Sequence, residues 1–376
     1  MKSRQFFHLA SSAKCTLYDR DYLLLTKYRI NEHLYKQSED AIQGVTNSMG
    51  FFISTYITKG ALTMKFGIIG TNWITDRFIK AAKEHTEFSI GAVYSRTEET
   101  GREFAEKHKV KNVYTNMIEM FQSGDIEAVY IASPNAFHAE QSISAMKNGI
   151  HVLCEKPAVT SLHEMDQVIN ASKEYQTTYM EAMKSTVTPT FLNLKENLAK
   201  IGPLRRFVFH YNQYSSRYDN YKAGIIENAF KPELGNGAKT DLGVYCIAPI
   251  IHLVGEPKSV LKNTYLLSTG ADGQGSMILN YSEFEAVIMY SKISDSHSAN
   301  EIQGENGVIE IDKISDPKQI TIKYKDGQTE DISIKHEFDS MYYEVEEFIK
   351  CVKNKQLEST INTHEISRSV TKILTL

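Results

Sequence analysis

The stretch Met64-Lys65-Phe66-Gly67-Ile68-Ile69-Gly70-Thr71-Asn72-Trp73-Ile74-Thr75 decides how the rest of this chain folds. Its short apolar run, 66–69, is typical of a buried parallel strand. The run ends at Gly70, and apolar residues then recur at helical spacing over 74–82. A strand, a tight glycine turn and a helix direct backbone N–H groups and the positive end of the helix toward a phosphate.

As a dinucleotide fingerprint, this turn is incomplete. Of the pattern G-x-G-x-x-G, the segment 70–75 keeps only the first glycine, Gly70. We expect Asn72 to make the turn, because asparagine tolerates a positive φ better than other non-glycine residues. Thr75 is small but branched, so helix and strand are expected to sit slightly further apart. Taken alone, the turn fits an ordinary strand–helix junction as well as a nucleotide site, and the downstream residues decide between them.

Length and composition predict an ordinary protein of two domains. The chain has 376 residues, of which 41% are hydrophobic and 23% charged, and its net charge is −4. That charge offers no footprint for nucleic acid or an anionic membrane, and no apolar run approaches the roughly 18 residues of a membrane helix. The cysteines lie far apart, at Cys15, Cys154, Cys246 and Cys351. We therefore expect a cytoplasmic protein with no disulfide framework and no metal site.

Residues 1–63 differ from the rest of the chain. A possible helix around 20–36 has no second half later in the chain, and 37–63 show no clear period. The codons of 59–63 could contain a ribosome-binding sequence ahead of Met64. We interpret 1–63 as an extension added by a wrongly assigned start, with a genuine regulatory extension as the alternative. The remaining chain divides into a predicted dinucleotide-binding domain, 64–185, and a predicted substrate-binding and oligomerisation domain, 186–376.

From Met64 onward, strand and helix patterns alternate. Six apolar strands are predicted at 66–69, 88–94, 113–114, 128–132, 151–154 and 177–182. This alternation implies an α/β domain of Rossmann type, with a right-handed, doubly wound parallel sheet.

After about residue 185, longer alternating strands separated by turn signals predict a second, α+β domain with an open, largely antiparallel sheet. Its strands are expected at 204–214, 259–267, 276–281, 284–290, 297–303, 308–313 and 320–324. Helices near 188–200, 241–254, 339–354 and 363–375 are expected to belong with this second sheet.

Three loops follow strand carboxyl ends in the first domain, which is the edge where doubly wound sheets bind ligands. They are the Gly70 turn, Ser133-Pro134-Asn135-Ala136-Phe137-His138, and Glu155-Lys156-Pro157. Proline keeps Lys156 out of the helical region, which makes a rigid corner. An isolated loop lysine is usually an exposed charge. Beside a nicotinamide, however, its ammonium can stabilise a substrate alkoxide during hydride transfer.

The spacing of G-x-x-G-T-x-x-I, S-P-N-x-x-H and E-K-P resembles the glucose–fructose oxidoreductase/inositol dehydrogenase (Gfo/Idh/MocA) family of nicotinamide-dependent dehydrogenases. The resemblance implies that Glu155 touches the cofactor and Lys156 the substrate, with His138 in a supporting position. Together with the Gly70 turn and the end of the second strand, it predicts these cofactor-binding residues: Gly70, Thr71, Asn72, Trp73, Ile74, Ser95, Arg96, Ser133, Pro134, Asn135, His138, Glu155 and Lys156.

A second family signature corresponds to residues 235–245. Asp241 and Tyr245 stand four apart at the start of a predicted helix and so share one face. Tyr245 replaces the usual histidine, which resembles the dihydrodiol dehydrogenase and aldose-type branches. We expect Lys156, Asp241 and Tyr245 to be catalytic, with Lys156 lowering the pKa of the Tyr245 phenol. The formal base stays unassigned, and an N-cap aspartate with a core tyrosine is the structural alternative.

The residues at the end of the second predicted strand indicate whether the protein prefers NAD or NADP. NAD enzymes carry Asp or Glu there, whereas this chain has Ser95 and Arg96. Arginine can pair with a 2′-phosphate and stack on adenine, so NADP is preferred over NAD.

Residues 211–221 are rich in tyrosine and amide side chains, which suit a sugar or diol ring; Arg217 and Tyr218 are candidate substrate contacts, although a solvated loop explains them equally well. The resemblance implies a carbohydrate, polyol or dihydrodiol substrate. It also implies a homodimer or homotetramer formed through the second sheet. A non-catalytic dinucleotide sensor of the same fold is the alternative function.

Overall fold

The computed structural model describes residues 63–376. Apart from Thr63, the expected extension lies outside the described residues, as does Cys15. Within the described part, the remaining cysteines are free and buried. Among residues 63–376, no helix is both long enough and apolar enough to cross a membrane.

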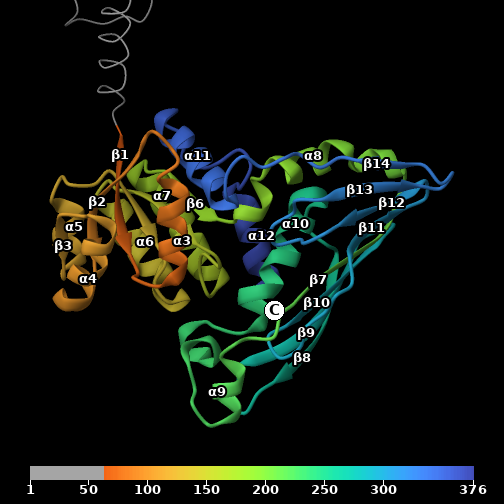
Figure 1. The fold of residues 1–376 in the computed structure, drawn as a ribbon, viewed down its shortest axis with the longest axis horizontal. Helices are drawn as coiled ribbons and strands as arrows, with labels where there is room; N and C mark the ends of the chain where they lie inside the picture. Colours follow the sequence, from red (N-terminus) through yellow and green to blue (C-terminus); the bar gives the residue numbers. More distant parts are fainter. Residues whose placement is uncertain (1–62) are drawn as a thin grey trace, which may run out of the picture. The chain divides into compact units, whose positions relative to one another are not determined.

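The first sheet has six parallel strands in the described chain, in the order β3-β2-β1-β4-β5-β6. The strands are β1 (Met64–Ile69), β2 (Phe88–Tyr94), β3 (Asn112–Tyr114), β4 (Ala128–Ile131), β5 (His151–Glu155) and β6 (Tyr179–Ala182). Strands β4 and β6 are buried along their whole length, as apolar runs between two layers of helices must be. The predicted doubly wound Rossmann sheet is confirmed (Figure 1).

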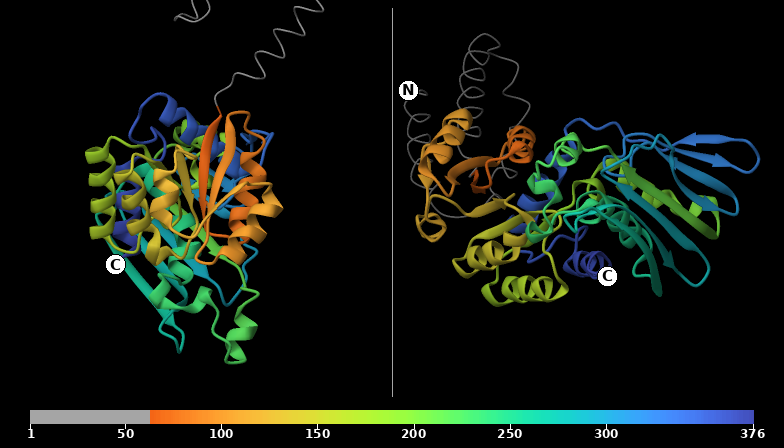
Figure 2. Two further views of the ribbon diagram at one scale, coloured as in Figure 1. Left: turned by 90° about the vertical axis from the view of Figure 1, so that its left-hand side faces the viewer. Right: turned by 90° about the horizontal axis from the view of Figure 1, so that it is seen from below.

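Helices cover both faces of this sheet (Figure 2). On one face lie α3 (Trp73–Ala82) and α4 (Glu98–His108), and on the other lie α5 (Met117–Gln122), α6 (His138–Lys147) and α7 (Leu162–Tyr175). The first face is tied to the sheet by aromatic packing, in which the rings of Phe78 and Tyr130 stack with centroids 3.5 Å apart.

The second sheet has eight strands in the described chain, in the order β14-β13-β12-β11-β7-β10-β9-β8. Its strands are β7 (Leu204–Asn212), β8 (Ser259–Leu266), β9 (Asp272–Asn280), β10 (Glu285–Ser291), β11 (Asn300–Gly304), β12 (Gly307–Ile311), β13 (Ile320–Tyr324) and β14 (Thr329–Asp331). Only β7 and β10 pair in parallel, so the predicted largely antiparallel sheet is confirmed. Strand β14 was not expected, because its three residues carry no apolar alternation.

The inner face of the second sheet packs on α10 (Val244–Val254), which is buried for nearly its whole length. Helix α8 (Pro189–Asn197) completes this layer. Helix α12 (His364–Leu374) contacts both α10 and α7, so it lies between the two sheets (Figure 1). This arrangement joins the two halves through a shared helical layer.

The expectation that the helix near 339–354 belongs with the second sheet is wrong. Helix α11 (Ser340–Lys353) packs on α3, and its apolar face joins the core of the first sheet. Phe348 shows why, because its ring lies 5.6 Å from that of Phe66 in β1. Sequence position alone could not predict this return, since amphipathic spacing identifies a buried face and not its partner.

Candidate functional site

Gly70 shapes the turn that follows β1. Its φ is +105°, and a Cβ there would lie 2.5 Å from the carbonyl oxygen of Ala132. Asn72 has φ −103°, so the expectation that it makes the turn through a positive φ is wrong. Asn72 caps α3 instead. Its Oδ1 accepts from the backbone N–H of Ile74 at 3.0 Å, and its Nδ2 donates to Ala132 at 2.7 Å.

This edge of the first sheet fits a dinucleotide. The positive end of α3 lies directly after the Gly70 turn, where it favours a phosphate. Strand β2 neighbours β1, so the loop after β2 reaches the same edge. In that loop Ser95 is buried, whereas Arg96 is exposed and stands just before the first turn of α4. This edge thus carries a glycine turn at a helix N-terminus and, in the loop after β2, an exposed guanidinium.

A cleft of about 820 Å³ is lined by loops of both sheets, a size typical of small-molecule sites. The predicted site residues that line it are Asn72, Trp73, Ile74, Ser133, Pro134, Asn135, His138, Glu155, Lys156, Arg217, Asp241 and Tyr245. The predicted site residues that are not in its lining are Gly70, Thr71, Ser95, Arg96 and Tyr218. Residues predicted from two separate motifs, about 85 positions apart, therefore meet in one cleft.

His138 joins the two loops at the floor of this cleft. Its imidazole is buried, with Nε2 lying 2.8 Å from the Ser133 carbonyl oxygen and Nδ1 lying 2.9 Å from that of Pro157. Burial lowers the pKa of His138, although the two carbonyl groups act in the opposite direction. Both ring nitrogens face backbone carbonyl groups, so His138 links the two loops.

Lys156, Asp241 and Lys292 form an ionic cluster in the cleft. Lys156 Nζ donates to Asp241 Oδ1 at 2.9 Å and to the Asp241 carbonyl oxygen at 3.0 Å. The other carboxylate oxygen, Oδ2, lies 2.9 Å from Lys292 Nζ. Asp241 sits in a wide helical turn, Lys239–Gly243, immediately before α10. Such π-type turns are frequent at functional sites because they re-aim a side chain.

The charges of this cluster are mutually stabilised. Burial alone would raise the pKa of Asp241, but the ammonium groups of Lys156 and Lys292 hold it well below its ordinary value. Burial likewise acts to lower the pKa of Lys156, yet the charge of Asp241 raises it above the ordinary value. Lys156 is therefore an ammonium at neutral pH and cannot act as a base there. It is a hydrogen-bond donor, with one of its three N–H groups not engaged by Asp241.

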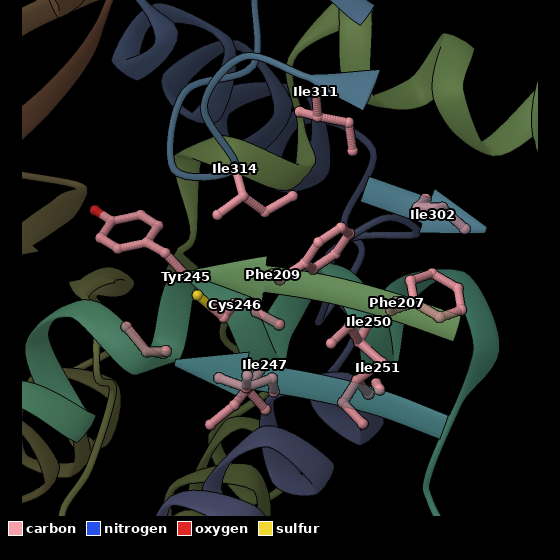
Figure 3. Close-up of a cluster of buried hydrophobic side chains, with 14 of the residues drawn as sticks. Phe207, Phe209, Tyr245, Cys246, Ile247, Ile250, Ile251, Ile302, Ile311 and Ile314 are labelled. Atoms are coloured by element: carbon pink, nitrogen blue, oxygen red, sulfur yellow. The ribbon is translucent and has the colours of Figure 1, made fainter. Parts of the chain in front are cut away.

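Tyr245 borders the cluster with its ring. The Nζ atoms of Lys156 and Lys184 lie 4.9 Å and 5.6 Å from the ring centroid. Figure 3 shows the hydroxyl pointing away from the apolar side chains that surround Cys246 and Ile247. Burial raises the pKa of Tyr245, and this outweighs the lowering effect of Lys156. The expectation that Lys156 makes this phenol more acidic than usual is therefore wrong, because burial favours the neutral phenol.

The two residues predicted to contact the substrate lie in different places. Arg217 lines the cleft, where its Nε lies 3.2 Å from Glu227. Tyr218 opens the short helix α9 (Tyr218–Lys222), which turns its ring toward Tyr221 and Phe230. It packs in that aromatic cluster and not in the cleft lining.

Of the lysines that line the cleft, Lys184, Lys292 and Lys313 were missed from sequence. Lys184 follows β6, so the rule that ligands bind at strand carboxyl ends could have found it; its Nζ donates to the Ser315 carbonyl oxygen at 3.3 Å. Lys292 follows β10 of the second sheet, and no local pattern marks it.

Two buried carboxyl groups lie behind the cluster. Glu155 Oε1 accepts from the Tyr130 hydroxyl at 2.6 Å, and burial raises the pKa of Glu155. Glu344 in α11 is fully buried, and neither carboxyl oxygen has a hydrogen-bond partner among the described residues. Burial, and then the charge of Glu155, raise the pKa of Glu344 well above its ordinary value. Burial therefore favours the uncharged form of Glu344.

Comparison with known proteins identifies both halves of the chain. Residues 64–183 match the model of the GFO/IDH/MocA oxidoreductase family with an NAD-binding Rossmann fold, and residues 191–310 match the GFO/IDH/MocA C-terminal domain. The chain is 50% identical to the scyllo-inositol 2-dehydrogenase (NADP(+)) IolU of Bacillus subtilis over 311 residues, which cover 83% of this chain and 95% of that protein.

More distant proteins share the same architecture. Trans-1,2-dihydrobenzene-1,2-diol dehydrogenase of Xenopus tropicalis is 26% identical and covers 83% of this chain and 96% of its own length. The crystal structure of aldose–aldose oxidoreductase from Caulobacter crescentus superposes with a TM-score of 0.74 at 17% identity, over 83% of this chain and 95% of that one. The expected family resemblance is confirmed, and the inositol enzyme is more similar than the dihydrodiol branch.

The Glu344→Gln substitution tests whether the fold raises the pKa of Glu344. Above about pH 4.3 the unfolded chain releases the Glu344 proton while the fold retains it, so stability falls as pH rises. Between pH 5 and 8, the free energy of unfolding should fall less steeply with pH in the variant than in the wild type. The two slopes should differ by up to about 1.4 kcal/mol per pH unit. Urea unfolding at several pH values measures this. Glu346→Gln, an exposed position on the same helix, is the control; parallel curves for wild type and Glu344→Gln would contradict a neutral Glu344.

Proposed function

We propose that this chain, which belongs to the GFO/IDH/MocA family of oxidoreductases with an NAD-binding Rossmann fold, is an NADP-preferring dehydrogenase of a cyclic polyol of the inositol type. The observation that carries the proposal is the Lys156 ammonium, which Asp241 fixes in the cleft beside the Tyr245 phenol. The relative at 50% identity, a scyllo-inositol 2-dehydrogenase that uses NADP(+), supports the substrate class.

The residues divide the work of moving a proton and a hydride. When bound, the nicotinamide cofactor supplies the carbon that accepts or returns the hydride. In the proposed mechanism the free N–H of Lys156 donates to the reacting oxygen of the substrate and stabilises its alkoxide character. Tyr245 exchanges the proton with that same oxygen: its phenol gives the proton when a carbonyl is reduced, and the phenolate so formed takes the proton back when the hydroxyl is oxidised. Asp241 keeps Lys156 charged and in place.

The cofactor contacts form a second part of the proposal. Gly70, Thr71 and the first residues of α3 would hold the pyrophosphate, because this turn brings backbone N–H groups and a helix dipole to one edge. Arg96 would bind the 2′-phosphate that distinguishes NADP from NAD. Glu155 and the Ser133–Asn135 loop would line the nicotinamide side of the cleft.

The outer face of the second sheet supports a homodimer. Strand β8 leaves three large apolar side chains more than half exposed, Leu261, Tyr265 and Leu266. Apolar side chains gathered on one exposed strand are a feature of interaction surfaces. We place the dimer in the cytoplasm, in keeping with the free cysteines of the described residues.

Light scattering should give a dimer that Leu261→Glu converts to monomer; a monomeric wild type would contradict this surface.

A polyol panel tests the dehydrogenase proposal. Purified protein should reduce NADP(+) with scyllo-inositol or a related inositol. Lys156→Met should lower the turnover by about 100-fold or more, because it removes the charged donor to the developing alkoxide. NADPH affinity, read by nicotinamide fluorescence, should change much less. Equal turnover would remove Lys156 from the mechanism, while NADPH binding without turnover of any polyol would favour the sensor alternative.

The Arg96→Ala substitution tests cofactor choice. Loss of a charge-assisted bond to the 2′-phosphate, of about 1.5 kcal/mol or more, should weaken NADPH binding by about tenfold. NADH binding should stay within about twofold, since NADH lacks this phosphate. Arg102→Ala is the matched control, because Arg102 is an exposed arginine of α4 that pairs with Glu98. Equal weakening of both cofactors would contradict the assignment.

A further inference from the structure

Lys292 is a buried amine whose role the proposed mechanism leaves open. It follows β10, and only 6% of its side chain is exposed. Its Nζ lies 2.9 Å from Asp241 Oδ2, donates to the Ala229 carbonyl oxygen at 3.4 Å, and lies 5.7 Å from the Phe230 ring centroid. A buried ammonium is costly unless it is paired, and Asp241 is its carboxylate partner within the described chain.

The Asp241 carboxylate is held at both ends. Lys156 occupies Oδ1 and Lys292 occupies Oδ2, so rotation of the carboxylate would break one of the two bonds. Without Lys292, both oxygens would be free to turn toward Lys156. Lys292 therefore fixes the direction from which Asp241 meets the Lys156 ammonium.

The net charge of Asp241, Lys156 and Lys292 also indicates a role for Lys292. One aspartate between two lysines leaves a net positive charge, whereas Asp241 and Lys156 alone would be neutral. A developing alkoxide is stabilised by an uncompensated positive charge beside it. Lys292 thus prevents Asp241 from cancelling the charge of Lys156.

The main chain of Lys292 is anchored independently of its side chain. Its N–H donates to Gly273 in β9 at 2.8 Å, and its carbonyl oxygen accepts from the Ser215 N–H at 2.8 Å. Ser215 lines the cleft. A substitution of the side chain therefore leaves these backbone bonds available, and the strand end should keep its place.

We infer that Lys292 is a positioning residue of the dehydrogenase site, which orients Asp241 and preserves the positive charge that Lys156 presents to the substrate oxygen. The inference rests on the proposed function. It assigns to the second sheet a charged residue that acts through Asp241 without touching the substrate.

Three variants separate the charge of Lys292 from its packing. Lys292→Met removes the charge at similar length, Lys292→Arg restores it, and Lys258→Met changes an exposed lysine ahead of β8 as the control. We expect the polyol turnover of Lys292→Met to fall by about 10- to 100-fold, as when a reacting group loses its alignment. Lys292→Arg should recover most of this loss, and NADPH affinity should stay within about twofold in each variant.

The pH profile supplies a readout that a merely structural role would not move. Asp241 loses one of the two cations that hold its pKa down, so the acid limb of the turnover profile should shift to higher pH in Lys292→Met. An unshifted acid limb, or turnover equal to wild type, would overturn the inference. If Lys292→Met does not fold, the same comparison is made between Lys292→Gln and Lys292→Arg. A wild-type protein that oxidises no polyol would instead overturn the proposed function.

Discussion

The arrangement of the cleft depends on one carboxylate shared by two lysines. Asp241 ties together the corner after β5, the turn before α10 and the end of β10, which lie far apart in the sequence. Because Lys292 is buried and Lys156 is partly buried, each bond is both an electrostatic and a positional constraint. The two sheets thus meet at an ionic contact in the cleft, and α12 joins them elsewhere through its contacts with α10 and α7.

Neighbouring titratable groups of this site differ in their charge states, some being charged and others neutral. Lys156 and Asp241 stay charged because each stabilises the other. For Tyr245 and Glu344 the nearby cations lower the pKa less than burial raises it, so burial favours their neutral forms. A fixed ammonium beside a neutral phenol is the combination that lets one group hold a substrate oxygen while the other exchanges its proton. The electrostatics therefore assign distinct roles to residues only a few ångströms apart.

The fold and the centre of the site could be predicted from sequence because both follow local rules. Apolar runs alternating with helical spacing identify a doubly wound sheet, and the carboxyl ends of its strands identify the loops that carry Lys156 and Asn135. The remainder depends on tertiary contacts. Asn72 is a helix cap because Gly70 already supplies the positive φ of the turn. The raised pKa of Tyr245 results from burial, which no sequence motif encodes. Lys292 has no neighbour in sequence to mark it; only the sheet brings it to Asp241.

Direct observation of hydride transfer tests the central claim most sharply. The full-length protein is incubated with NADP(+) and scyllo-inositol deuterated on its ring carbons, and the reduced cofactor is examined by proton NMR. A polyol dehydrogenase working through the Lys156 cleft places deuterium at C4 of the nicotinamide on a single face of the ring. Reduced cofactor without deuterium at C4, or no reduction with any deuterated inositol despite NADPH binding, would contradict this account of the site.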